Sequence, residues 1–143
     1  MMEKFSQKIT HAMNVTPQQA WEVISKVEGV DQWFASLIKT CRIADGKRFC
    51  ETHDGSKLDE DIIEVNAETK TFVYGIPSQE MLPVENIVGT MKVKSISDQK
   101  TEVEWSATFD ADKENAPVAQ EAFRNLWTMG LKDMETFINS KNQ

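Results

Sequence analysis

The stretch that decides the fold is residues 14–34, NVTPQQAWEVISKVEGVDQWF, in which a strand ends and a helix begins. Thr16 is a good N-cap, and Pro17 is a good first helical residue because its φ is already helical and it has no amide hydrogen that would need a partner. Apolar residues then recur at helical spacing, and Gly29 is expected to end this helix. The segment VDQWFAS that follows predicts a second, brief helix.

Strand and turn signals surround that stretch. Before it, alternation of apolar and polar residues predicts a strand over about residues 5–14, with His11 in phase with the apolar face. After it, Asp45-Gly46 and Asp54-Gly55 have the composition of two-residue hairpin turns. A meander of antiparallel strands is therefore expected, extending to about residue 110.

A long helix is predicted near the C-terminal end. Pro117 opens it, and its apolar residues form one continuous stripe that must lie against the sheet. The element order is one strand, two short helices, about six strands and a helix longer than the average of about 11–12 residues. We therefore expect an α+β fold in a single domain, residues 1–143, in which an antiparallel sheet of six to seven strands packs against the long helix.

Composition excludes some classes of function. The 143 residues include 16 basic and 23 acidic side chains, which gives a net charge of -7. No run of Lys and Arg is dense enough to neutralise a phosphate backbone, so nucleic acid is not expected as a partner. The first residues, MMEKFSQKIT, lack the apolar core of a signal peptide, and no apolar stretch approaches membrane-spanning length. We expect a cytoplasmic protein without integral membrane association.

Cys41 and Cys50 are the two cysteines of the chain. If Asp45-Gly46 is the tip of a two-residue hairpin, residues 41 and 50 lie directly opposite each other. Two interpretations are open: a pair of reduced, partly buried thiols, as is usual in the cytosol, or a redox pair. A metal site built from Cys50 and His53 is disfavoured, because an odd offset on a strand sends the two side chains to opposite faces.

The phrase V-T-P-x-x-A-W-E-V-I, with a tryptophan near the second helix, resembles the polyketide cyclase/dehydrase branch of the START-like (SRPBCC) superfamily. G-K-R at the start of a strand, then L-D-E-D-I-I-E-V-N, F-V-Y-G-I and T-E-V-E-W, follow in the order usual for that family. The resemblance covers nearly the whole chain, and its strength lies in the order and spacing of the motifs. It implies the helix-grip fold, in which a curved antiparallel sheet wraps around the long C-terminal helix and which the family shares with birch-pollen allergens and plant abscisic-acid receptors.

The resemblance also implies a hydrophobic cavity between the sheet and the long helix. Strand alternation and helix phase select the residues that would line it, and the alternative for each is a filled core. Gly89 in a strand and Gly130 in the helix each cost up to about 1 kcal/mol relative to alanine, so each is expected to leave room for close packing or for a ligand. The expected ligand-binding residues are Trp33, Ile38, Glu60, Phe72, Tyr74, Ile87, Met91, Trp105, Phe123, Trp127 and Leu131.

Three polar residues are candidates for acid–base catalysis or for orienting a ligand. Glu60 matches the glutamate that lines the cavity in many relatives, but its acidic neighbours also fit a solvated face. The two isoleucines that follow imply a bulge or a phase change in the strand, which leaves the direction of Glu60 open. Tyr74 would add a hydroxyl. His11 would act as a general base, although a histidine on a strand is more often a hydrogen-bonded core or rim residue. Ala35 stands where the plant receptors have a ligand-holding lysine, so their chemistry is not expected.

Three functions are compatible with these observations. The leading hypothesis is a bacterial binding module, for transport or sensing, that encloses a small hydrophobic or amphipathic ligand such as a lipid, polyketide or aromatic metabolite, with residues 53–57 and 77–83 at the mouth. The second is a cyclase or dehydratase-type enzyme, disfavoured because no paired catalytic constellation is visible. The third is a protein-interaction domain with a filled cavity. None of them calls for a cofactor or a metal, and both a monomer and a homodimer fit the sequence.

Overall fold

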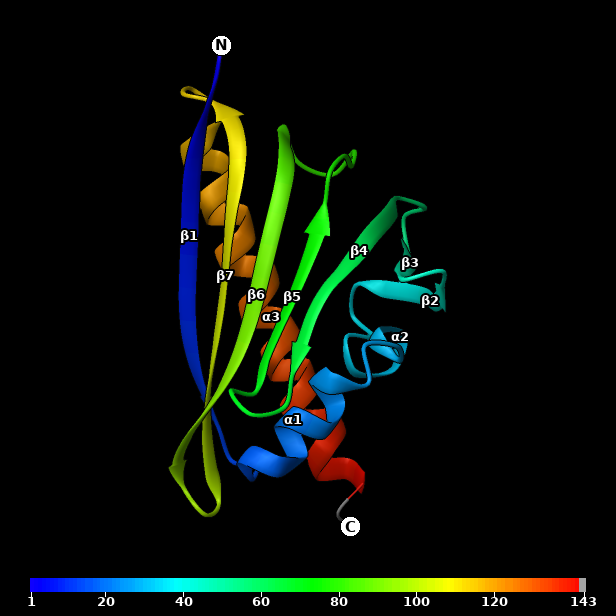
Figure 1. The fold of residues 1–143 in the computed structure, drawn as a ribbon, viewed down its shortest axis with the longest axis vertical. Coiled ribbons are helices and arrows are strands. Elements are labelled where there is room, and N and C mark those ends of the chain that lie inside the picture. Colours follow the sequence, from blue (N-terminus) through cyan, green and yellow to red (C-terminus); the bar gives the residue numbers. More distant parts are fainter. Residues whose placement is uncertain (142–143) are drawn as a thin grey trace.

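One antiparallel sheet of seven strands curves around a long helix in the computed structural model, which describes residues 1–141 (Figure 1). The spatial order of the strands is β1-β7-β6-β5-β4-β3-β2, so the chain forms a meander whose last strand pairs with the first. The expected fold class is confirmed. The strands are β1 (Met2–Met13), β2 (Ile38–Ala44), β3 (Lys47–Thr52), β4 (Lys57–Asn66), β5 (Thr71–Ile76), β6 (Val84–Ser97) and β7 (Lys100–Asp112).

Three helices complete the fold. They are α1 (Pro17–Ser25), α2 (Val30–Trp33) and α3 (Ala116–Lys141). In Figure 1, α3 crosses one face of the sheet, and α1 and α2 lie near its C-terminal end. The buried residues of α3 form the apolar stripe expected from the sequence, and this stripe packs against β1 and β7.

The start of α1 follows the sequence prediction, but its end does not. The Thr16 hydroxyl accepts a 3.1 Å hydrogen bond from the Gln19 amide, and the Gln19 side chain accepts a 2.9 Å bond from the Thr16 amide, which makes a capping box. The prediction that Gly29 ends this helix is wrong. The helix ends at Ser25 because the chain turns into the left-handed region at Val27, with φ of 67°, and Gly29, with φ of 83°, instead precedes α2 as its N-cap.

The hairpin between β2 and β3 has the geometry expected for its sequence. Asp45 and Gly46 have φ values of 54° and 74°, the pair of positive angles that a type I′ turn requires. The turn fixes the register, and Cys41 pairs with Cys50 as predicted.

The bulge expected in β4 lies after Glu60. The register with β5 shifts between Ile62 and Glu64, and Ile63 is turned outward with 54% of its surface exposed. Glu60 lies before this shift and pairs with Arg48 of β3, so it shares the inner face with that residue. Glu60 is 6% exposed, which settles the direction that the sequence left open.

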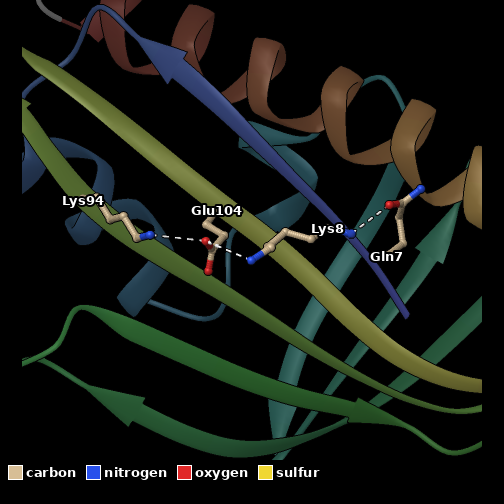
Figure 2. A network of polar contacts seen from close by, with 4 residues as sticks. All are labelled: Gln7, Lys8, Lys94 and Glu104. Atoms are coloured by element: carbon tan, nitrogen blue, oxygen red, sulfur yellow. Dashed lines mark hydrogen bonds and ion pairs between the residues drawn. The ribbon is translucent and has the colours of Figure 1, made fainter. Parts of the chain in front are cut away.

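The outer face of β1, β7 and β6 carries exposed charges. The Glu104 carboxylate lies 3.2 Å from the Lys94 ammonium and 3.8 Å from that of Lys8, across three adjacent strands (Figure 2). The Lys8 amide also donates a 2.9 Å hydrogen bond to the Gln7 side chain. Exposed ion pairs of this kind contribute at most about 1 kcal/mol each to the free energy of unfolding. Within residues 1–141, no helix is both long enough and apolar enough to cross a membrane.

Candidate functional site

A cavity of about 100 Å³ lies between the inner face of the sheet, α2, α3 and the loop that follows β5. Two of the predicted residues do not line it. Phe72 is 1% exposed and stacks on Tyr74 with ring centroids 5.6 Å apart, while Leu131 is completely buried in the core. The nine predicted residues that do line the cavity are Trp33, Ile38, Glu60, Tyr74, Ile87, Met91, Trp105, Phe123 and Trp127.

Aromatic rings fill much of the space that the curved sheet encloses. Trp105 and Trp127 stack with centroids 5.6 Å apart and an interplanar angle of 14°, and Phe123 lies 5.1 Å from Trp127. Trp33 of α2 approaches Trp105 at 6.2 Å. These rings explain why the cavity is smaller than the roughly 300–1,000 Å³ of most ligand pockets.

The polar end of the cavity is built by Arg48 of β3 and Glu60 of β4. These residues are directly opposite each other in the sheet, and each side chain is 8% exposed. Arg48 Nε donates a 2.6 Å hydrogen bond to Glu60 Oε1, and Nη2 forms an ion pair with the same oxygen. Arg48 was not among the site residues predicted from the sequence. The sequence indicates the direction of its side chain, because Arg48 is two residues from Cys50 on the same strand and shares its face. Its pairing with Glu60 could be known only from the register between β3 and β4.

The same arginine reaches the turn between α1 and α2. Arg48 Nη1 donates a 2.7 Å hydrogen bond to the carbonyl oxygen of Val27. Its guanidinium carbon also lies 5.2 Å from the Phe72 ring centroid and 5.7 Å from that of Tyr74, within the range of cation–π attraction. Arg48 is thus held by a carboxylate, a backbone carbonyl and two aromatic faces.

Tyr74 and Trp105 are joined by a hydrogen bond inside the protein. Trp105 Nε1 donates to the Tyr74 hydroxyl oxygen at 2.9 Å, and both residues are buried. Gly89 is the partner of Tyr74 on β6, and a methyl group there would overlap the phenol ring. Gly130 plays a similar part on α3, where a Cβ would lie 2.8 Å from the ring of Phe34. Both glycines therefore serve close packing against an aromatic ring.

Burial dominates the electrostatics of this group. It raises the pKa of the Glu60 carboxyl, and the charge of Arg48 works against that rise. Burial is the largest single influence on Arg48 and would lower its pKa, but the charge and hydrogen bond of Glu60, together with Cys50 and Tyr74, raise that pKa above its usual value. Burial, followed by the Glu60 charge, raises the pKa of the Tyr74 phenol. The cavity therefore holds a permanent cation, a carboxyl that takes up a proton more readily than in water, and a phenol that keeps its proton.

The loop after β5 borders the cavity, and the other expected mouth loop does not. Gln79 stabilises residues 77–83, since its amide nitrogen donates to the carbonyl oxygens of Leu82 (2.9 Å) and Val84 (3.0 Å) and its oxygen accepts from the Leu82 amide (2.9 Å). Gln79, Met81 and Leu82 all line the cavity. Residues 53–57 do not contribute to the lining.

His11 lies away from this cavity. It is half-buried on β1, opposite Val103, and does not belong to the lining. Its Nε2 atom is buried and has no hydrogen-bond partner among residues 1–141. The structure therefore does not bring His11 together with Glu60 and Tyr74. In the same part of the chain, no group of three or more His, Cys, Asp or Glu side chains is arranged to hold a metal ion.

Other lining residues were not among the predicted ligand-binding residues, although three of them belong to the loop of residues 77–83 that was expected at the mouth. They come from α2 and the segment after it, from β3 to β5, from the loop after β5 and from α3, and most have aliphatic side chains that carried no distinctive sequence signal. They are Val30, Phe34, Leu37, Cys50, Leu58, Ile76, Gln79, Met81, Leu82 and Leu126.

Residues 2–136 match the family described as polyketide cyclase/dehydrase and lipid transport. The chain belongs to this family. The matched segment runs from β1 into α3, and it confirms the resemblance found in the sequence. No curated protein is similar enough to the sequence to count as a match.

Solved structures confirm the fold of this family member. XoxI from Bacillus cereus superposes with a TM-score of 0.85 at 20% identity, covering 96% of this chain and 98% of its own. Norcoclaurine synthase from Thalictrum flavum, solved with dopamine and hydroxybenzaldehyde, has a TM-score of 0.79 at 10% identity and coverages of 97% and 88%. Major latex-like protein 151 from Panax ginseng has a TM-score of 0.79 at 12% identity and coverages of 93% and 96%. At identities this low, the superpositions establish a shared helix-grip fold, and function has to be argued from the residues of the site.

Proposed function

We propose that this protein binds a small aromatic or short aliphatic molecule that carries one hydrogen-bond donor, with the apolar part among the indole and phenyl rings and the donor at Glu60. The observation that carries this proposal is the buried Arg48–Glu60 pair at one end of an otherwise apolar cavity. A buried ion pair often contributes less to stability than apolar residues of the same volume would, so its presence beside a cavity favours a role in recognition.

The free oxygen of Glu60 supports the choice of a donor. Both Arg48 nitrogens that reach Glu60 meet Oε1, and Oε2 makes no hydrogen bond within residues 1–141. A carboxylate oxygen accepts hydrogen bonds only, so its complement on a ligand is a hydroxyl or an amine. The neighbouring Arg48 keeps the pair neutral overall, which favours a ligand with little net charge.

The size of the cavity restricts the ligand. At about 100 Å³, the space accommodates a single ring or a short chain, and a longer molecule would have to displace the loop of residues 77–83 or the helix α2. The stacked rings of Trp105 and Trp127 offer flat apolar surfaces to a planar group. Norcoclaurine synthase, which has the same fold, was solved with two single-ring aromatic molecules, and this supports an aromatic ligand here.

A second candidate is an acid–base enzyme that uses the same cavity. Glu60 favours it, because a carboxyl whose pKa is raised by burial is suited to exchange a proton with a bound substrate. In this case Tyr74 would help to position the reacting group. A bound molecule that is converted by the wild-type protein but persists unchanged in E60Q would favour catalysis over simple binding.

The experiment that tests the binding proposal has two steps. Native mass spectrometry of the purified protein, followed by denaturation, reveals any molecule that copurifies. The protein is then titrated with benzyl alcohol, phenol and toluene, with binding followed by tryptophan fluorescence. We expect the two probes with a donor to bind more tightly than toluene by about tenfold or more, which corresponds to one hydrogen bond to a charged group.

A matched pair of variants gives the control. E60Q should remove most of this preference for a donor, whereas D61N should keep it, because Asp61 is the next residue on β4, lies on the opposite face and has a side chain that is 45% exposed. An empty protein that takes up none of the three probes, nor a hydrophobic fluorophore, would contradict the proposal. It would turn attention to the outer surface, where Ile63 and Ile96 are more than half exposed.

A further inference from the structure

Cys41 and Cys50 face each other across the hairpin of β2 and β3, beside the cavity but outside the proposed ligand chemistry. Ala44 and Lys47 flank the two-residue turn and form a pair joined by backbone hydrogen bonds. From there along the two strands, pairs with and without backbone hydrogen bonds alternate. Counting back from the turn, Cys41 and Cys50 form a pair without backbone hydrogen bonds between them. In such pairs the Cα atoms are about 4.5 Å apart and the side chains approach closely.

This spacing permits a disulfide. Bridged cysteines have Cα atoms about 4.4–6.8 Å apart, so the pair lies at the short end of the allowed range and needs little movement of the backbone.

The two thiols differ in environment. Cys41 is half-buried and borders a surface cleft of about 480 Å³ that lies between α1, α2 and the end of α3. Cys50 is only 4% exposed; it borders the inner cavity and, together with Cys41, a second cleft along the hairpin. An oxidant from solvent therefore reaches Cys41 first.

Hydrogen bonding makes the outer thiol the more acidic one. The Cys50 thiol donates to Cys41, and this bond, together with one from the Val30 amide, lowers the pKa of Cys41 to about 7 although burial opposes the change. The same thiol–thiol bond, reinforced by burial, raises the pKa of Cys50. At neutral pH the accessible sulfur is thus partly a thiolate, the nucleophilic form, and the enclosed sulfur keeps its proton.

We propose that Cys41 and Cys50 form a reversible dithiol–disulfide site, in which Cys41 reacts first with a hydroperoxide and Cys50 completes the bridge. The Cys41 thiolate attacks the peroxide oxygen, the O–O bond breaks, and the leaving oxygen departs as water or an alcohol after taking a proton, so that Cys41 becomes a sulfenic acid. The Cys50 sulfur then attacks the Cys41 sulfur. The S–O bond breaks, water leaves with the Cys50 proton, and the S–S bond forms. Two thiols are oxidised and one peroxide is reduced.

The test uses the reduced full-length protein and hydrogen peroxide. Intact mass spectrometry under denaturing conditions should show the loss of two hydrogen atoms, and peptide mapping should find residues 41 and 50 linked within one chain. Excess reduced glutathione should restore both thiols. Linkage between two chains, or stepwise addition of oxygen without loss of hydrogen, would overturn the proposal.

Two isosteric variants separate the roles of the cysteines. In C50S, dimedone added with peroxide should trap a sulfenic acid at Cys41. In C41S, the remaining Cys50 should react more than about tenfold more slowly than Cys41 does in C50S, because it is enclosed and protonated. Circular dichroism checks that both variants fold. Equal rates in two folded variants, or the absence of a dimedone adduct in folded C50S, would show that Cys41 is not the first residue to react.

Discussion

Arg48 Nη1 donates a 2.7 Å hydrogen bond to the carbonyl oxygen of Val27, a β-branched residue with φ of 67°. Side chains of this kind avoid the left-handed region, where an L-residue costs about 1–2 kcal/mol. The bond therefore helps to hold a strained turn between α1 and α2. Because Arg48 also binds Glu60, one guanidinium links the carboxyl of the cavity to the turn that positions α2.

Replacing Arg48 by lysine should loosen that turn. A lysine keeps the positive charge beside Glu60, but its single ammonium group cannot reproduce the planar fork that reaches both Glu60 and Val27. We expect amide hydrogen exchange to accelerate by about tenfold or more at residues 26–30, corresponding to the loss of a charged hydrogen bond. Exchange in β6 and β7 should stay nearly unchanged.

The control is R42K, since Arg42 is on the neighbouring strand and its guanidinium lies 4.3 Å from the Phe49 ring on the outer side of the hairpin. That variant should leave the exchange of residues 26–30 as in the wild type. If R48K behaves in the same way as R42K, the bond to Val27 does not stabilise the turn.

The Arg48–Glu60 pair should show strong coupling in a double-mutant cycle. Removing one partner, in R48M or E60L, leaves a buried group without its counterpart and should lower the free energy of unfolding by about 3–5 kcal/mol. The double variant R48M/E60L should lose much less than the sum of the two, because no charge remains uncompensated. Urea denaturation of the four proteins measures the coupling.

The neighbouring ion pair provides a matched control. Lys47 and Asp61 bridge the same two strands at 3.4 Å, but their side chains are 52% and 45% exposed. The cycle of K47M and D61L should give a coupling of less than about 1 kcal/mol, as for other exposed pairs. Equal coupling in the two cycles would mean that burial does not govern the strength of the inner pair.

Gly89 should tolerate alanine poorly, whereas Gly75 should tolerate it well. In G89A the new methyl group overlaps the Tyr74 ring, which is enclosed and cannot yield without losing its bond to Trp105, so a loss of about 1–3 kcal/mol is expected. In G75A the single tight contact of the methyl, at 3.2 Å, is with the end of the exposed Ile63 side chain, which can move aside; its other neighbours lie at ordinary van der Waals distance. Thermal or urea unfolding of both variants provides the comparison, and a G89A protein as stable as G75A would contradict it.

The alkylation rate of Cys41 should depend on pH near neutrality. Iodoacetamide reacts with the thiolate, and the pKa of Cys41 is lowered to about 7, mainly by the hydrogen bond from Cys50. The rate should therefore rise with pH, reach half its maximum near pH 7 and level off above it. In C50A the donor is absent, so the midpoint should move up toward the ordinary cysteine value of about 8.5, while C50S, which keeps a donor, should shift less. A midpoint that is the same in all three proteins would exclude the thiol–thiol bond as the cause.

The sequence by itself determined the features that depend on neighbouring residues. The beginning of α1 follows from Thr16 and Pro17, because capping involves only the first turn of a helix. The opposition of Cys41 and Cys50 follows from the turn at Asp45-Gly46, because a two-residue hairpin fixes its own register. The order of the strands, the apolar stripe of α3 and the family resemblance made the helix-grip fold predictable, but the residues predicted from the sequence account for less than half of the cavity lining.

Only the tertiary structure decided the polar end of the cavity. Period-two alternation says which residues of β4 share a face, but acids stand at three successive positions, so the pattern does not say which face is inside. Pairing with β3 places Glu60 inward and opposite Arg48. The Val27 carbonyl, in the turn that follows α1, is likewise bound by a residue of a distant strand, Arg48. The inward direction of Glu60 and the partners of Arg48 were thus decided by contacts between residues far apart in the chain, which local sequence preferences do not specify.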